Sequence, residues 1–238
     1  MSNIRTASAF FALGILAVAQ VNAAILTGSV APPAASNNLT TEGALDWIHW
    51  GLNTATDVNR KATGLSQISN FTTVGSGTTV VRLTNSASKY SWIDGSPTLT
   101  ATNTPGGVYV NNFDGPGRGF IFTVPADLLQ RVLRVYIGEF SASGTLQATL
   151  SDNSAPAFSL VLTGAADQTV QGVYTLDYAA ASLGQTLTVK WTETTDLGTA
   201  DNVTMQAATL SLPIIPEPAT LLSMASAALL ILARRRSR

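Results

Sequence analysis

The chain has 238 residues and a formal net charge of −1, with no cysteine and a single histidine, His49. The lack of cysteine excludes disulfide bonds, thiolate metal sites and a cysteine nucleophile within this chain, and one histidine excludes a zinc site with two histidine ligands. Between residues 24 and 213, 8 basic side chains stand against 13 acidic ones. Because phosphate recognition requires clustered lysine and arginine, this acidic region argues against a nucleic-acid partner.

The first residues have the layout of a secretory signal peptide. Arg5 precedes an apolar run of 13 residues, and small side chains flank the bond between Ala23 and Ala24. We therefore predict a signal peptide over residues 1–23, which signal peptidase removes after Ala23; cleavage after Ala19 is the second choice. The alternative, an uncleaved membrane helix, is disfavoured because the run is shorter than the roughly 20 residues that span a bilayer.

A second apolar run, residues 219–233, lies near the other end of the chain. It contains no charge, follows a Pro-rich spacer at 213–218, and precedes a basic tail at 234–238 that includes Arg234, Arg235 and Arg236. A helix of this length extends about 22 Å, which is less than a hydrocarbon core of roughly 30 Å. The pattern predicts a short transmembrane helix with its arginines on the cytoplasmic side and the rest of the chain across the membrane.

The spacer contains Pro216, Glu217 and Pro218, followed by the short apolar run and the arginine cluster. In this order the three parts resemble the PEP-CTERM sorting signal of exported Gram-negative bacterial proteins, over residues 214–238. The resemblance implies a transient stay in the inner membrane, recognition of Pro-Glu-Pro by an exosortase, and removal of the tail. The protein would then be at the cell surface or outside the cell. A plain C-terminal membrane anchor is the alternative.

Apolar and polar side chains alternate in short segments of the middle region, separated by Gly, Asn, Asp, Ser and Pro. This period of two predicts strands with one buried face. The expected inward residues are Val81 and Leu83; Phe120, Phe122 and Val124; Leu133, Val135 and Ile137; Leu146, Ala148 and Leu150; Phe158, Leu160 and Leu162; and Leu187, Val189 and Trp191. The strongest helical candidate is a single turn at 126–130. We predict an all-β jelly-roll sandwich over residues 42–212, preceded by a strand or linker at 24–41.

The segments ALDWIHWGL, NRKATGLSQISNF, YSWIDGSPT, TPGGVYV, GFIFTVPAD and RVYIG also carry a looser likeness. Together they are similar to galactose-binding-like β-sandwich modules of secreted bacterial proteins, from about Glu42 to Ser211. The resemblance implies the fold and an extracellular setting, and it carries no particular activity or ligand.

Two aromatic segments could bind a ligand. In DWIHWG, an extended backbone places Trp47 and His49 on one face and Ile48 and Trp50 on the other. An exposed Trp47 beside His49 could stack on a sugar ring and bond its hydroxyls. The alternative is that all these rings are packed, with Trp47 and His49 closing an edge of the sandwich and His49 bonded to Asp46 or to the backbone.

In YSWIDGSPT, Tyr90 and Trp92 share one face and precede the turn pair Asp94-Gly95. Aromatic side chains next to a turn could line a carbohydrate groove at the rim of a sandwich. A packed hairpin is the alternative. The candidate ligand-binding residues are therefore Trp47, His49, Tyr90 and Trp92.

Signals for metal binding or catalysis are weak, and we predict no resident cofactor, no metal and no enzymatic activity. Calcium could bind to turn residues, although none forms a known calcium loop: Asn111, Asn112 and Asp114; Asp152 and Asn153; Asp201 and Asn202. Glycoside hydrolysis requires two suitably spaced carboxylates, and the middle region has only three glutamates, none in a recognised motif: Glu42, Glu139 and Glu193. Glu139, with the parity of a buried face, is the carboxylate that a pocket would use.

Three functional hypotheses follow from the sequence. The first is an exported surface or matrix protein whose sandwich binds exopolysaccharide. The second is a purely structural matrix protein without a small ligand, and the third is a glycan hydrolase. Expected partners are signal peptidase, exosortase and extracellular polysaccharide, with only a transient stay in the inner membrane.

Overall fold

The computed structural model describes residues 23–111 and 115–214. Outside these residues lie the predicted signal peptide apart from Ala23, the Pro-Glu-Pro segment, the C-terminal apolar run and the arginine tail. Within the described part, no helix is long and apolar enough to cross a membrane. Strands make up 56% and helix 2% of the described residues, which confirms the all-β prediction.

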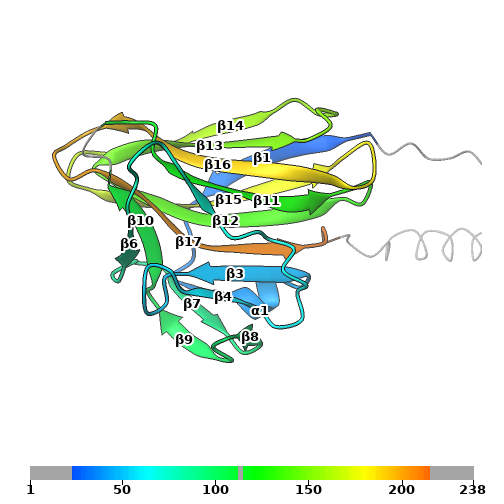
Figure 1. The fold of residues 1–238 in the computed structure, drawn as a ribbon, viewed down its shortest axis with the longest axis horizontal. Coiled ribbons are helices and arrows are strands. Elements are labelled where there is room, and N and C mark those ends of the chain that lie inside the picture. The colour runs from blue at the N-terminus through cyan, green and yellow to red at the C-terminus, as the bar shows by residue number, and fades with distance from the viewer. Residues whose placement is uncertain (1–22, 112–114, 215–238) are drawn as a thin grey trace, which may run out of the picture.

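Two antiparallel sheets form the body of the protein (Figure 1). The larger sheet has the order β1-β15-β12-β17-β3-β4-β8, and β10 joins its β17 to β6. Its strands are β1 (Ile25–Ala31), β3 (Asp46–Trp50), β4 (Val58–Lys61), β6 (Val80–Leu83), β8 (Gly95–Ser96), β10 (Gly107–Asn111), β12 (Arg131–Phe140), β15 (Thr169–Ala179) and β17 (Asn202–Ser211). The smaller sheet has the order β14 (Phe158–Leu162), β13 (Ala142–Leu150), β16 (Gln185–Asp196), β11 (Gly119–Ala126) and β5 (Thr72–Val74).

The main core fills the space between these two sheets, as in a β-sandwich. It contains most of the residues that the period of two placed inward, among them Phe120, Leu133, Leu146, Val189 and Trp191. The expected sandwich and its inward faces are therefore confirmed for these strands. Long registers, such as Arg131–Phe140 of β12 against β15 and β17, fix which side chains share a face.

A third, three-stranded sheet packs on the outer face of the larger sheet. It consists of β2 (Ser36–Asn38), β7 (Lys89–Trp92) and β9 (Ala101–Thr104), and the short helix α1 (Leu39–Glu42) lies beside it. In Figure 1 these elements lie below β17, on the side away from β13 and β16. Between them and the larger sheet is a second core, which we call the small core: Leu39, Trp47, Tyr90, Trp92, Tyr136 and Ala207.

Two strands pair with the same edge of β17, one after the other along its length. Its first half, through Met205, pairs with β10, and its second half, from Ala207, pairs with β3. The two neighbours meet at Gly51, whose φ of +72° is unfavourable for other residues and whose Cβ, if present, would lie 1.9 Å from the carbonyl oxygen of Gly107. Glycine at position 51 therefore permits the close backbone approach where the sheet divides.

Two local expectations were wrong. In β6, Val80 packs against the main core, whereas Val81 and Leu83 do not belong to it. The strand β6 pairs only with β10, at the margin of the larger sheet. The alternation of its side chains therefore does not predict which of them face the main core. The segment 126–130 ends β11 and continues as a bend without a helical turn, and the described helix is α1 instead. Asn38 caps α1 by accepting a hydrogen bond from the Thr41 amide at 3.2 Å.

Candidate functional site

The structure brings the four predicted ligand-binding residues together, but inside the small core. The ring centroids of Trp47 and Trp92 are 5.2 Å apart, and His49 lies 5.1 Å from Trp92 and 5.6 Å from Tyr90. Trp47 and His49 have no exposed surface, and Tyr90 and Trp92 are 1% exposed. The expectation that these rings stack on a sugar at the surface is therefore corrected, because the three-stranded sheet covers them.

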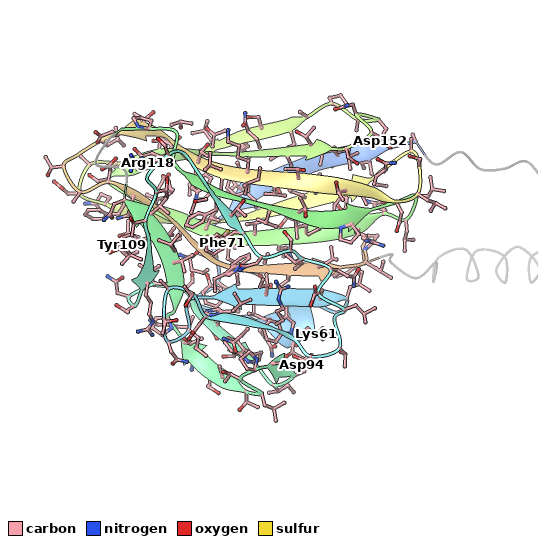
Figure 2. The ribbon with its side chains drawn as sticks, viewed as in Figure 1. Lys61, Phe71, Asp94, Tyr109, Arg118 and Asp152 are labelled. Carbon is pink, nitrogen blue, oxygen red and sulfur yellow. The ribbon has the colours of Figure 1, made fainter. Side chains whose placement is uncertain are left out.

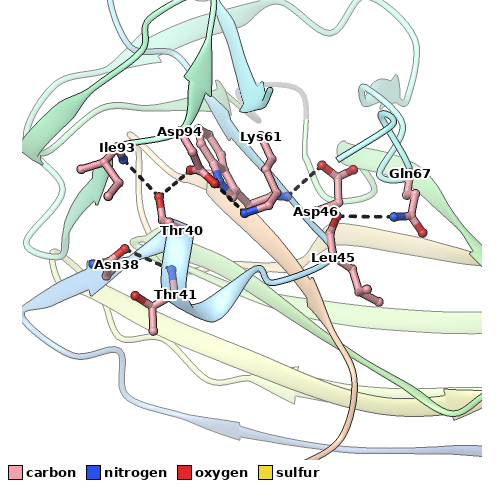
Figure 3. A network of polar contacts seen from close by, with 10 residues as sticks. Asn38, Thr40, Thr41, Leu45, Asp46, Lys61, Gln67, Ile93 and Asp94 are labelled. Atoms are coloured by element: carbon pink, nitrogen blue, oxygen red, sulfur yellow. Dashed lines mark hydrogen bonds and ion pairs between the residues drawn. The ribbon is translucent and has the colours of Figure 1, made fainter. Parts of the chain in front are cut away.

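The indole N–H groups of both tryptophans have acceptors within the protein, and Figure 3 shows the surroundings of one of these acceptors, Asp94. The indole N–H of Trp47 donates to Asp94 Oδ1 at 3.0 Å, and that of Trp92 donates to the Thr98 carbonyl at 2.9 Å. Asp94 also forms an ion pair with Lys61 at 2.5 Å. These contacts satisfy the N–H groups of both indoles within the protein, as buried tryptophans require.

The buried histidine is neutral at ordinary pH. Complete burial lowers the pKa of His49 to about 3, because the interior disfavours the charged imidazolium. The packed alternative expected His49 to bond Asp46 or the backbone. Asp46 does not bond to it, because the Asp46 carboxylate accepts hydrogen bonds from the backbone amides of Trp47 and Ile68, each at 2.9 Å. The backbone of Gly106 is the group that opposes the lowering of the His49 pKa. Burial raises the pKa of Asp46. Both residues act as parts of the packed structure.

The same outer face of the larger sheet continues beyond the small core without a cover. Register places four side-chain positions of β10, β17, β12 and β15 in one row across it, which are Tyr109, Thr204, Gly138 and Gln171. The adjacent row is Asn111, Asn202, Phe140 and Thr169. With Leu83, Asn85 and Ser86 at one side, these rows border an open cavity of about 460 Å³, which we call the groove.

The groove is aromatic and polar but carries no charged side chain on its described outer face. Tyr109 and Phe140 are partly buried, so each offers a ring surface from a fixed position. Figure 2 shows Tyr109 at the margin of the molecule, on β10. Around the rings stand amides and hydroxyls: Asn85, Asn111, Asn202, Gln171, Ser86, Thr169 and Thr204. Such groups can both donate and accept hydrogen bonds to a neutral, hydroxyl-rich molecule.

Two features hold the floor of the groove in place. Gln171 donates to the Ser86 hydroxyl at 2.8 Å and accepts from the Ser88 amide at 3.1 Å, so its amide orientation is fixed. Gly138 lies between Thr204 and Gln171, and a Cβ at this position would be 2.9 Å from Thr204 Oγ1. Because Gly138 has no side chain, the space above the backbone at the centre of the groove stays open.

Glu139 faces the opposite side of β12, toward the interior of the sandwich. It has the parity of Leu133, Val135 and Ile137, as expected from the sequence, and it is fully buried. Burial raises its pKa to about 8, and the nearby carboxylate of Glu193 on β16 adds to this shift. Both carboxylate oxygens are shielded from solvent. The groove therefore borders the backbone side of Glu139 rather than an accessible acid.

Among the described residues there is no group of three or more acidic or histidine side chains that could hold a metal ion. Asp152 instead accepts hydrogen bonds from the amide and hydroxyl of Ser154 at 3.1 and 2.7 Å, which stabilises a turn. Two of the residues considered for calcium, Asn111 and Asn202, belong to the groove. Asn112 and Asp114 lie outside the described residues.

No protein-family model matches this chain, and no curated protein does. Solved structures give a partial likeness. TmCBM61 in complex with β-1,4-galactotriose is 10% identical, with a TM-score of 0.40, over 64% of this chain and 95% of that one. The CBM22-1 and GH10 modules of a Clostridium thermocellum endo-1,4-β-D-xylanase, complexed with xylohexaose, are 12% identical, with a TM-score of 0.36, over 60% and 26% of the two chains.

The enzymatically active domain of a bacteriophage CBA120 tailspike protein is 9% identical, with a TM-score of 0.37. It is matched over 62% of this chain and 20% of its own length. Identities and scores this low assign no ligand, so the chemistry of the groove has to be argued from its own residues.

Sequence reasoning missed Tyr109 and Phe140. The signal for Tyr109 was present, because in GVYVN it alternates with the buried Val108 and Val110 and so lies on the opposite face of β10. An aromatic side chain at such a position marks a candidate surface only where no other element covers it, as Trp47 shows.

Proposed function

We propose that this protein is an exported, non-enzymatic β-sandwich of the jelly-roll class that binds carbohydrate in the groove. The observation that carries the proposal is the pair of partly buried rings, Tyr109 and Phe140, set among neutral amides and hydroxyls. Aromatic faces pack against the apolar C–H face of a sugar, while amides and hydroxyls bond its hydroxyl groups. A groove without exposed charge favours a neutral polysaccharide.

The sequences at the two ends of the chain suggest to us how the sandwich reaches its ligand. Signal peptidase would remove residues 1–23, and an exosortase would recognise Pro216-Glu217-Pro218 after a transient stay in the inner membrane. The mature protein would then meet exopolysaccharide at the cell surface or in the extracellular matrix. Intact mass of the protein from the envelope and the medium tests this route, since a mass that still includes Arg238 in every fraction contradicts it.

Binding is tested with residues 24–213, which contain both described cores. We expect retention on neutral polysaccharide in affinity electrophoresis, and loss of retention in Tyr109→Ala and Phe140→Ala proteins that keep the unfolding midpoint of the parent. Gln171→Ala should also weaken binding. Gln147→Ala is the matched control, because Gln147 is an exposed glutamine on the outer face of the smaller sheet.

The outcome separates this proposal from the two alternatives. Retention that survives both aromatic substitutions would place binding elsewhere. An absence of retention on every polysaccharide, together with self-association that sugars do not alter, would favour a purely structural matrix protein. Release of reducing sugar from the polysaccharide would favour a hydrolase.

A further inference from the structure

One end of the sandwich carries a concentration of exposed apolar side chains. Five large ones gather there, with exposed fractions of 43, 56, 73, 46 and 92%: Leu128, Leu129, Leu183, Leu212 and Ile214. We call this set the leucine end. Leu128, Leu129, Leu212 and their neighbours Ile25 and Pro213 also border a shallow apolar cavity of about 460 Å³. An apolar cluster at one end of a soluble fold marks an interaction surface.

Three segments distant in sequence build this end. The loop after β11 contains Leu128 and Leu129, and the loop after β15 contains Leu183; the amide of Ala180 donates to the Asp127 carbonyl at 2.8 Å and joins the two loops. The last residues of β17 lie beside them, because Ser211 pairs with Val132. Figure 1 shows both ends of the described chain leaving the molecule at this side.

The charged groups at the leucine end are engaged within the protein. Asp127, the only charged residue in the two loops, pairs with Arg131 at 2.6 Å. The nearby Asp152 accepts hydrogen bonds from Ser154 and from the amide of Ala181. The two loops therefore present leucine side chains with their one carboxylate paired, while Asp152 beside them stays negatively charged, which suits an apolar partner without net negative charge.

The chain beyond the described residues indicates which partner this is. Only four residues lie between Ile214 and Ala219, where the apolar run of residues 219–233 begins. The five residue steps from 214 to 219 span at most about 18 Å when extended. When the run lies in a bilayer, the leucine end is therefore held close to the interfacial layer.

We propose that the leucine end docks on the lipid interface during the membrane-tethered stage, with its leucine side chains in the boundary between headgroups and acyl chains. This inference rests on the proposed sorting route. Phe140 and Asn202 lie at the opposite ends of β12 and β17 from Val132 and Ser211, so docking turns the groove away from the bilayer. The tethered protein is thereby oriented with its carbohydrate surface outward.

The test uses the full chain in phosphatidylcholine vesicles, where the lack of native cysteine allows a single labelled site. An environment-sensitive fluorophore on Leu183→Cys should show a blue-shifted emission and several-fold lower quenching by an aqueous quencher. The same label on Val161→Cys is the matched control, because Val161 is 49% exposed but lies toward the groove end of the sandwich, opposite Thr145 of β13. Its emission and quenching should stay as in water.

Each result decides one question. Loss of the protection at position 183 in a Leu128→Ser, Leu129→Ser protein that still floats with vesicles supports docking by leucine side chains. Equal quenching at positions 183 and 161 in vesicle-bound protein overturns docking and leaves the sorting route intact. Failure of the full chain to float with vesicles overturns both, and protection at position 183 without lipid assigns this surface to a second copy of the chain.

Discussion

Trp47 and Asp94 are joined by a 3.0 Å hydrogen bond between the indole N–H and Oδ1, across 47 residues of sequence. The same carboxylate forms an ion pair with Lys61 and accepts a hydrogen bond from the hydroxyl of Thr40. A single side chain thus ties β3, β4 and α1 together at the edge of the small core.

Replacement of Asp94 by alanine should therefore destabilise the protein. The change leaves the Trp47 N–H without its acceptor, which costs about 1–3 kcal/mol of unfolding free energy. The Lys61 pair adds little, because Asp94 is 28% exposed and solvent screens the charges. Urea unfolding followed by tryptophan fluorescence measures the loss. Asp167→Asn, at an exposed turn, is the control and should stay within about 0.5 kcal/mol of the parent.

Trp92→Ala should be more damaging, because it removes the buried ring that packs on Trp47 and His49 of the larger sheet. Truncation of a buried tryptophan costs about 3–5 kcal/mol. Ile93→Ala, at the next residue, is the matched control, since Ile93 is 72% exposed and should change stability little. If the folded fraction of the Trp92 variant binds polysaccharide as the parent does, the small core has no direct role in binding; reduced affinity per folded molecule would contradict this.

The unfolding free energy should fall as pH rises from about 6.5 to about 8. Burial raises the pKa of Glu139 from 4.5 to about 8, so in this range the folded protein keeps a proton that the unfolded chain has released. His49, with its pKa lowered from 6.5 to about 3, acts in the opposite direction below pH 6.5, where the unfolded chain takes up a proton first.

Glu139→Gln tests this assignment. One bound proton corresponds to a slope of at most about 1.4 kcal/mol per pH unit, and the variant should lose the decline between pH 6.5 and 8 in denaturant titrations. Asp196→Asn, an exposed change near the same end of the sandwich, should keep it. A decline of unchanged slope in the Glu139 variant would show that another group is responsible.

Gly138→Ala should weaken carbohydrate binding. A methyl group at this position would lie 2.9 Å from both Thr204 Oγ1 and the Val170 carbonyl, so it raises the floor of the groove and forces a local shift. Overpacking of this kind costs about 1–3 kcal/mol of stability. Isothermal titration of the folded variant should show lower affinity, and unchanged affinity would place the ligand away from the centre of the groove.

Much of the sandwich could be predicted from the alternation of side chains. Phe122, Val135 and Val189 face the main core as expected, because a strand buried on one face shows its pattern directly. The parity of DWIHWG was also correct, since Ile48 and Trp50 belong to the main core and Trp47 belongs to the small core.

The sequence pattern could not reveal that the second face of β3 is covered as well. The cover comes from three short strands: β2, which comes shortly before β3, and β7 and β9, which follow much later in the chain; β2 pairs with β7 in parallel. Without that contact, Trp47 and His49 look like an exposed aromatic site. The groove was hidden for a related reason, because its two rows of side chains come from four strands and are assembled only by register.

A bulge at Gln206 divides β17 into a part that borders the groove and a part that supports the small core. Opposite Tyr136 and Ile137 the register skips this residue, so Asn202 and Thr204 border the groove and Ala207 supports the small core, while Val203 and Met205 face the main core. Under the proposed function, substitutions at positions 202 and 204 can alter ligand choice without removing a side chain from either core. A lineage with this architecture can therefore diversify its specificity at low risk to its own folding.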